Sequence, residues 1–163
     1  MKKKASIIII LLLFISGYSQ TLLTGKVIGI KDGDTVVVID KLNKTTILRL
    51  AEVDCPEKKQ AFGTKAKQYT SDAVYLKTVT YIVINKDRYG RSVAKIYYQN
   101  KYLSAEIIKS GMGWHFKKYS TSKELAQFEQ QARSKKLGLW IDPNPIYPSE
   151  WRKVKKSTNS ILF

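Results

Sequence analysis

The stretch from Leu22 to Leu50 constrains the fold most, because it is rich in β-branched residues and is interrupted by turn signals. Asp32-Gly33 is typical of a tight turn between two strands, and Leu42-Asn43-Lys44 predicts a second turn. The strands predicted around these turns are Gly25–Ile30, Thr35–Ile39 and Thr45–Leu50. Together they predict a meander of three strands.

The periodicity changes after this meander. Apolar residues recur at spacings of four and three between Phe62 and Leu76, which predicts one face of an amphipathic helix. The elements predicted next are strands at Val79–Asn85 and Val93–Tyr98, a helix at Leu103–Ser110, and a helix that begins with a capping box of Thr121 and Glu124. Five strands with a helix after the third predict an α+β fold, a five-stranded OB-fold β-barrel with three helices.

With 163 residues, of which 44% are hydrophobic, the chain has enough apolar side chains for the core of one domain of ordinary size. Lysine and arginine number 29 against 13 acidic residues, which gives a formal net charge of +16. This excess indicates a polyanionic partner, such as nucleic acid, an anionic membrane surface or an acidic polysaccharide. The single cysteine excludes an internal disulfide framework, and the single histidine argues against a histidine-rich zinc site.

Both ends of the chain differ in composition from the middle. Lysines at positions 2–4, an apolar run over 7–15 and small residues before position 20 predict a secretory signal peptide over residues 1–19. The run is shorter than the roughly 20 residues of a membrane-spanning helix, and an uncleaved N-terminal anchor is the alternative. We therefore expect a secreted or periplasmic protein, with a domain over residues 20–141 and a basic extension over 142–163.

Six of the 13 acidic residues lie between positions 32 and 57. Like charges about 4 Å apart repel by several kcal/mol, so such a cluster in a basic protein indicates a cation among the carboxylates. Oxygen ligands suit Ca²⁺ or Mg²⁺ and not zinc. We interpret Asp32 as a turn residue, and Asp40 and Glu52 as solvated surface charges.

The three remaining acidic residues form the candidate site: Asp34, Asp54 and Glu57. Arg49 precedes two of them on a neighbouring strand, and Pro56 stiffens the loop that holds them. Spacing alone gives this set only moderate weight as a site.

Three separated stretches carry most of the charged residues singled out so far. They are Asp32-Gly33-Asp34-Thr35-Val36, Arg49-Leu50 with Val53-Asp54-Cys55-Pro56-Glu57, and Asp87-Arg88-Tyr89-Gly90-Arg91. In order and spacing they resemble the signature motifs of the thermonuclease, or staphylococcal nuclease-like, family. Further points of similarity are Ser104-Ala105-Glu106, Gly111 and Leu137-Gly138-Leu139-Trp140. The resemblance covers Gly25 to Trp151 and is specific because three motifs occur in register.

The resemblance implies an OB-fold enzyme that hydrolyses phosphodiester bonds in DNA and RNA with one Ca²⁺ ion and leaves 3′-phosphate ends. It implies that Asp34 and Asp54 are the carboxylate ligands of Ca²⁺, with the backbone carbonyl of Cys55 as a further ligand. DNA and RNA would be substrates cut with little sequence specificity, and we expect a monomer.

By the same resemblance, Glu57 would orient or deprotonate the attacking water. Arg49 and Arg91 would hold the scissile phosphate, a role that suits planar guanidinium groups because they form paired hydrogen bonds with phosphate oxygens. Tyr89 would hydrogen-bond a terminal phosphate, and Arg88 beside it is assigned to substrate binding.

The chain departs from the family pattern at several positions. Cys55 replaces the usual small or hydroxyl residue, and we interpret it as a small buried hydrophobic residue. The loop over residues 58–62 is shorter than in the best-known member of the family. The tyrosines that follow Gly111 in the family have no clear equivalents, and Trp114 and Phe116 there suit either base stacking or core packing. His115 is interpreted as a surface or packing residue.

A second function stays open from the sequence. A non-catalytic OB-fold module that binds single-stranded nucleic acid, or another polyanion at the cell surface, would also use the clusters of lysine. It would be favoured if the carboxylates or arginines of the motifs were missing, and they are present.

Overall fold

The computed structural model describes the backbone of residues 21–160 and the side chains of residues 21–154. The predicted signal peptide over residues 1–19 lies outside the described residues. Between residues 21 and 160, the helices are all too short or too polar to cross a bilayer.

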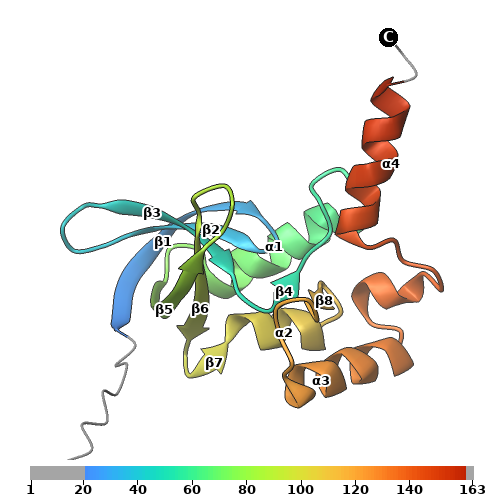
Figure 1. The fold of residues 1–163 in the computed structure, drawn as a ribbon. Helices are drawn as coiled ribbons and strands as arrows, with labels where there is room; N and C mark the ends of the chain where they lie inside the picture. The colour runs from blue at the N-terminus through green and yellow to red at the C-terminus, as the bar shows by residue number, and fades with distance from the viewer. Residues whose placement is uncertain (1–20, 161–163) are drawn as a thin grey trace, which may run out of the picture.

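Five strands form a closed barrel (Figure 1). They are β1 (Leu22–Asp32), β2 (Thr35–Ile39), β3 (Thr45–Leu50), β5 (Thr78–Lys86) and β6 (Ser92–Tyr98). β1 pairs antiparallel with β2 and β5, β2 with β3, and β5 with β6, while parallel pairing of β3 with β6 closes the ring. The predicted α+β fold with a five-stranded OB-type barrel is therefore confirmed.

Three short strands add pairings at the barrel rim: β4 (Val53–Asp54), β7 (Lys101–Tyr102) and β8 (Trp114–His115). β7 extends the sheet beside β6, and β4 pairs with β8. Through the pairing of β4 with β8, the segment that follows β3 is joined to the segment between α2 and α3.

Alternation along the strands fills the barrel interior. On β3, Leu48 and Leu50 are buried in the core, and Ile47 and Arg49 point to the other face, as the period of two predicts. Leu48 and Leu50, the residues on either side of Arg49, anchor β3 in the hydrophobic core. The side chain of Arg49 is thereby held on the outer face of the strand.

The described residues form four α-helices, with a short 3₁₀ helix before the last, and the last α-helix projects away from the barrel (Figure 1). They are α1 (Gly63–Val74), α2 (Leu103–Lys109), α3 (Lys123–Ser134), η1 (Gly138–Ile141) and α4 (Pro148–Ser160). The sequence predicted only three helices, because the tail combines three prolines with a basic run. Pro148, however, is the first residue of α4, a position where the missing N–H has no helical partner to lose.

Two details of the helices differ from the prediction. α1 ends at Val74, and Leu76 beyond it has a φ of 59° and is exposed, so it does not extend the apolar face. α3 is capped by Ser122, whose hydroxyl accepts a hydrogen bond of 3.2 Å from the N–H of Leu125. The predicted capping box is therefore wrong by one residue, because two adjacent residues carry side chains that suit the cap.

A second apolar cluster lies apart from the barrel core. Its buried members are Trp114, Ala132, Leu139 and Trp140, with Phe62 and Tyr147 packed against them. The ring centroids of Trp114 and Tyr147 are 5.1 Å apart. This cluster fixes the start of the C-terminal extension to the body of the protein.

Candidate active site

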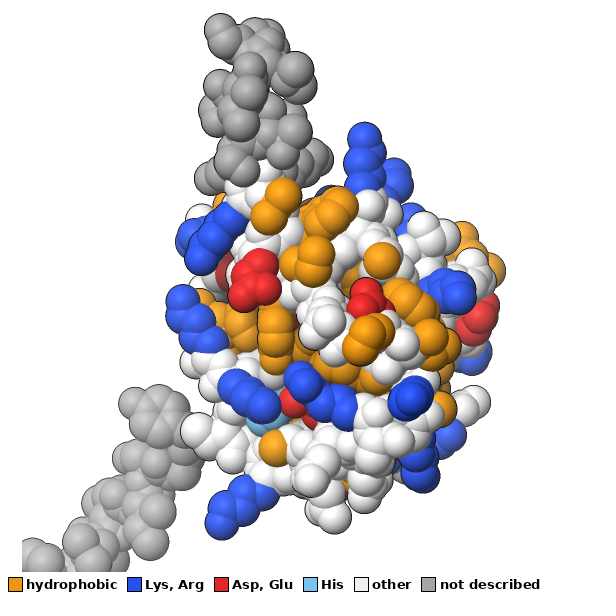
Figure 2. All heavy atoms as spheres, turned by 90° about the vertical axis from the view of Figure 1, so that its right-hand side faces the viewer, with side chains coloured by type: hydrophobic (Ala, Val, Ile, Leu, Met, Phe, Trp, Pro, Cys, Tyr) orange, Lys and Arg blue, Asp and Glu red, His pale blue; other side chains and the backbone are white. Residues whose placement is uncertain are grey.

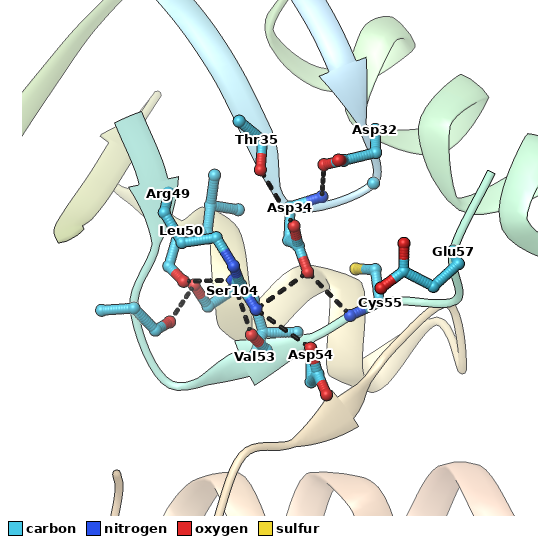
Figure 3. Close-up of polar contacts among 12 residues, drawn as sticks. Asp32, Asp34, Thr35, Arg49, Leu50, Val53, Asp54, Cys55, Glu57 and Ser104 are labelled. Atoms are coloured by element: carbon cyan, nitrogen blue, oxygen red, sulfur yellow. Dashed lines mark hydrogen bonds and ion pairs between the residues drawn. The ribbon is translucent and has the colours of Figure 1, made fainter. Parts of the chain in front are cut away.

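The centre of the site is an arginine between two carboxylates (Figure 3). Nη2 of Arg49 lies 3.0 Å from Oδ2 of Asp34 and 3.0 Å from Oδ1 of Asp54. Asp34 comes from the two-residue turn between β1 and β2, Arg49 from β3, and Asp54 from β4. All three side chains are about nine-tenths buried. The structure thus brings together three of the residues that the sequence predicted as a site.

Backbone groups hold this arginine and its partners in place. Nη1 of Arg49 donates to the carbonyls of Leu50, at 2.6 Å, and Val53, at 2.9 Å. The N–H of Cys55 donates to Oδ2 of Asp34 at 2.9 Å. These bonds fix the chain at the end of β4 beside the Asp34 carboxylate.

The second predicted arginine is joined to the same cluster through a hydroxyl. Nη1 of Arg91 donates to Oγ1 of Thr35 at 3.3 Å, and that hydroxyl donates to Oδ1 of Asp34 at 3.1 Å. Nε of Arg91 also pairs with Oδ2 of Asp87 at 2.7 Å. Thr35 belongs to the first motif but had no predicted role, and the structure shows it as the link between Arg91 and Asp34.

Burial and mutual repulsion perturb the carboxyl groups. Burial, with the charge of Asp34, raises the pKa of Asp54 to about 6 although Arg49 opposes the shift. The same two causes raise the pKa of Asp32 to about 6. Burial alone would lower the pKa of Arg49, but the charges of Asp34 and Asp54 outweigh it and raise this pKa. Arg49 therefore stays cationic.

Asp32 has a larger part in the site than the sequence indicated. Its Oδ1 accepts a hydrogen bond of 3.3 Å from the N–H of Asp34, as expected of a turn residue. Burial and the charge of the neighbouring Asp34 raise the pKa of Asp32, so this carboxyl also contributes to the electrostatics of the site. The Asp32-Gly33 pair indicates a turn in either case, so the sequence could not show that Asp32 also influences the site.

The carboxylate of Glu57 points toward the side of the site where Asp34 and Asp54 lie (Figure 3). It is about two-fifths exposed, and its charge contributes to the raised pKa of Asp54. Its partner in the structure is Arg152 of α4, with which it forms an ion pair. The sequence offered no sign of this partner, because the two residues are 95 positions apart.

The loop that carries Glu57 is held closely by the start of α1. The N–H groups of Gln60 and Gly63 donate to the carbonyls of Glu57 and Gln60, at 2.8 Å and 2.9 Å. A Cβ at Gly63 would lie 1.9 Å from the carbonyl oxygen of Glu57, so no other residue fits there without moving this loop. Gly63 was not among the residues predicted to matter for the site.

The predicted substrate residues Arg88 and Tyr89 lie on the turn between β5 and β6. The Tyr89 ring is 68% exposed, and the guanidinium carbons of Arg88 and Arg91 lie 4.8 Å and 5.6 Å from its centroid. Tyr89 therefore stands next to Arg91 at the surface. In the described part of the chain, the contact that links Arg88 to the site is the one with this ring.

Several other predicted roles can be compared with the structure. Cys55 is a free thiol that is 4% exposed, and burial raises its pKa, as a packing residue requires. Trp114 and His115 are buried, and burial lowers the pKa of His115, so packing accounts for both. Phe116 is half-buried and its ring contacts that of Tyr119, which is exposed.

The interpretation of Glu52 as a solvated charge is wrong. Its carboxylate accepts hydrogen bonds from the hydroxyls of Tyr102 and Ser120, at 2.8 Å and 3.0 Å, and pairs with Lys95 at 3.1 Å. Burial raises its pKa, but these hydrogen bonds outweigh burial and lower it. Glu52 therefore ties three segments together, a role that depends on contacts distant in sequence.

The donor set suits a hard divalent cation. Asp34 and Asp54 place two carboxylates on one guanidinium, that of Arg49, and the charge of Asp34 also contributes to the raised pKa of Asp32. Among the described residues, no three His, Cys, Asp or Glu side chains are arranged to hold a metal ion. The predicted set needs only two side chains, the carboxylates of Asp34 and Asp54, with the backbone carbonyl of Cys55 as a third donor. Because all three donors are oxygens, this set fits Ca²⁺.

Comparisons with known proteins identify the family of this chain. Residues 47–142 match the family model described as staphylococcal nuclease homologue. The chain is 45% identical over 149 residues to a protein of Haemophilus influenzae named uncharacterized endonuclease, which covers 90% of this chain and 84% of that protein. It is 35% identical over 148 residues to the micrococcal nuclease of Shigella flexneri, with 83% and 84% covered. The chain therefore belongs to the staphylococcal nuclease family.

Proposed function

We propose that this protein is a Ca²⁺-dependent nuclease that hydrolyses phosphodiester bonds of DNA and RNA with little sequence specificity and leaves 3′-phosphate ends. One observation carries the proposal: Arg49 lies between the buried carboxylates of Asp34 and Asp54, and Arg91 is joined to the same cluster through Thr35. A protein that only held a polyanion would gain nothing from buried carboxylates at its binding surface.

The roles of the chain's residues follow from the chemistry of the reaction. Attack of water in line with the leaving oxygen adds negative charge to the equatorial oxygens of the phosphate. The guanidinium forks of Arg49 and Arg91 match those oxygens and stabilise the added charge. Arg49 must leave its carboxylate partners to do so, and a phosphate is a strong enough competitor because it also accepts bidentate hydrogen bonds.

Asp34, Asp54 and the carbonyl of Cys55 would hold the Ca²⁺ ion. When bound, this ion neutralises charge on a phosphate oxygen and on the carboxylates beside the polyanion. Glu57 takes a proton from the attacking water as the new phosphorus–oxygen bond forms. The bond to the 5′ oxygen breaks, that oxygen gains a proton, and the phosphate stays on the 3′ side. Tyr89 hydrogen-bonds a terminal phosphate, with Arg88 beside it.

A digestion assay tests this proposal. Purified protein is incubated with plasmid DNA and with RNA in Ca²⁺ and in EGTA, and products are end-mapped. We expect cutting only with Ca²⁺, products with 3′-phosphates, and loss of activity in Glu57→Gln. Glu124→Gln, which removes one exposed carboxylate from α3, is the matched control and should stay active. Tight DNA binding in EGTA without cutting under any metal would instead indicate the non-catalytic binding module.

We also propose that the protein is exported and acts as a monomer. The export proposal is supported by the basic, apolar and small-residue segments over residues 1–19. Expression of the full chain in a Gram-negative host, followed by N-terminal sequencing of the periplasmic fraction, should show a start at Gln20. A start at Met1 with the protein in the membrane fraction would show an uncleaved anchor. Light scattering of the purified protein tests the monomer.

A further inference from the structure

Arg152, the ion-pair partner of Glu57, lies outside the part of the chain that matches the family model, whereas Glu57 lies within it. That match ends at residue 142, and Arg152 is in the second turn of α4, Pro148–Ser160. Its guanidinium forms an ion pair with Oε1 of Glu57, and its charge also counteracts the raised pKa of Asp54. A third arginine is therefore present at the site, supplied by the C-terminal extension.

The position of Arg152 is fixed by contacts before α4. The side-chain amide of Gln60 donates to the carbonyl of Ile146 at 2.5 Å, which joins the Glu57 loop to the extension. Tyr147 packs on Trp114 with ring centroids 5.1 Å apart. The carbonyl of Tyr147 accepts from the N–H of Trp151 at 2.9 Å, within the first turn of α4. These contacts place Arg152 beside the catalytic loop.

The ion pair itself is easily exchanged. The side chains of Arg152 and Glu57 are 47% and 39% exposed, and ion pairs between such side chains contribute at most about 1 kcal/mol. A phosphate offers the same guanidinium a bidentate partner with more negative charge. Figure 2 shows one face of the molecule, on which lysine and arginine side chains lie around apolar side chains and a few acidic ones.

We propose that Arg152 binds a backbone phosphate next to the scissile one, and that this phosphate replaces Glu57 as its partner. The exchange frees Glu57 to accept the proton of the attacking water, so occupancy of the neighbouring phosphate position prepares the site. This inference rests on the proposed function and extends it to substrate length. Strands with flanking phosphates gain from Arg152, and a substrate with one phosphodiester does not.

Kinetics on two substrates test the exchange. The variants are Arg152→Ala and, as a matched control, Lys153→Ala, which removes an adjacent exposed charge for which the described residues show no contact with Glu57. On a single-stranded 20-mer, we expect Arg152→Ala to raise KM about 5-fold or more, and Lys153→Ala less than 2-fold. On a dinucleoside monophosphate, Arg152→Ala should leave kcat/KM unchanged or raise it. Equal loss of kcat on both substrates would show that Arg152 merely positions Glu57, and would overturn the proposal.

Binding in EGTA gives a second readout that does not depend on cleavage. Kd for the 20-mer is measured by fluorescence anisotropy for wild type, Glu57→Gln, Arg152→Ala and the double variant. Glu57→Gln should bind more tightly than wild type, and most of this gain should vanish when Arg152 is also removed. A binding slope against log[salt] about 0.7 shallower in Arg152→Ala would show that this variant neutralises one phosphate fewer.

The same gain with and without Arg152 would overturn the exchange. An identical weakening by Arg152→Ala and Lys153→Ala would do so as well, because it would show only the general positive field. If wild type cuts neither substrate, the proposed function fails while the binding cycle still decides whether Arg152 exchanges partners.

Discussion

Arg49 has two sets of partners that it cannot satisfy together, the carboxylates of Asp34 and Asp54 and the phosphate of a substrate. In the structure it uses Nη2 for both carboxylates and Nη1 for two backbone carbonyls. A lysine would keep the charge, but its single ammonium group could not reproduce the planar fork. The function of this residue therefore depends on its shape as well as its charge.

We expect Arg49→Lys and Arg91→Lys each to lower kcat for DNA cleavage by on the order of 10²-fold or more, as for other groups that stabilise transition-state charge. Arg133→Lys is the matched control, because Arg133 pairs with Glu129 and stacks on Trp140 away from the site. Its kcat should stay within about twofold of wild type. Retention of full kcat in both site variants would show that charge alone suffices.

Asp54 provides a test of the site's charge balance. Its pKa of about 6 lies above the usual value near 4. In metal-free protein, the stabilising effect of its proton is therefore complete below about pH 4 and is lost as pH rises through 6. Asp54→Asn stays neutral. In EGTA it should therefore be more stable than wild type at pH 8, by on the order of 1–3 kcal/mol, with the difference vanishing near pH 4.

Urea unfolding at several pH values measures this difference. Saturating Ca²⁺ should reverse its sign at pH 8, because the ion stabilises only the protein that binds it. A variant that is less stable than wild type at pH 8 in EGTA would contradict the charge balance described here.

Among single residues, the sequence predicts those members of the site that lie within its motifs. Asp34, Arg49 and Asp54 meet because turn and strand positions determine where their side chains point. The roles of Glu52 and Arg152 could not be predicted, since their partners are more than 40 residues away and depend on how the helical side packs.

Among the elements, α1 has the most direct influence on the site, because Gly63 at its start touches the Glu57 carbonyl. We expect Gly63→Ala to displace this loop, lower kcat at least about tenfold, and cost about 1–3 kcal/mol of unfolding free energy. Gly29→Ala is the matched control, because a Cβ on β1 would meet only Val37 side-chain atoms at 3.5 Å.

Gly29→Ala should keep both kcat and unfolding free energy close to wild type. Activity assays and urea unfolding of the two variants check this pair. Equal effects at both glycines would mean that the close approach at Gly63 does not position Glu57.

The ends of helices and strands could be predicted where the apolar residues followed a single period along the segment. β2 and β3 have the predicted bounds, because each alternates between the core and the outer face and ends at a turn. α4 was missed because its sequence is basic, follows a proline-rich stretch and has only two apolar residues besides Pro148, namely Trp151 and Val154. The segment just before α4 is held by the hydrogen bond from Gln60 to the Ile146 carbonyl and by the packing of Tyr147 on Trp114, contacts between residues distant in sequence that no local pattern contains.

For the molecule as a whole, the net charge of +16 determines how substrates of different length respond to salt. Each phosphate neutralised on a single strand contributes about −0.7 to the slope of log affinity against log[salt]. If a single-stranded polymer has three phosphates neutralised, its kcat/KM should fall about 20-fold between about 50 and 200 mM NaCl. A dinucleoside monophosphate, with its one phosphate neutralised, should lose about 3-fold.

Steady-state assays of both substrates at constant free Ca²⁺ measure these slopes. Ca²⁺ binding, followed by calorimetry at both salt concentrations, serves as the control, because the buried carboxylates are screened less than surface charges. Equal losses on the two substrates would place the effect of salt at the buried carboxylates. A steeper loss on the polymer would show that phosphates beyond the one that is cut are neutralised by lysines and arginines outside the site, which therefore contribute to binding of the strand.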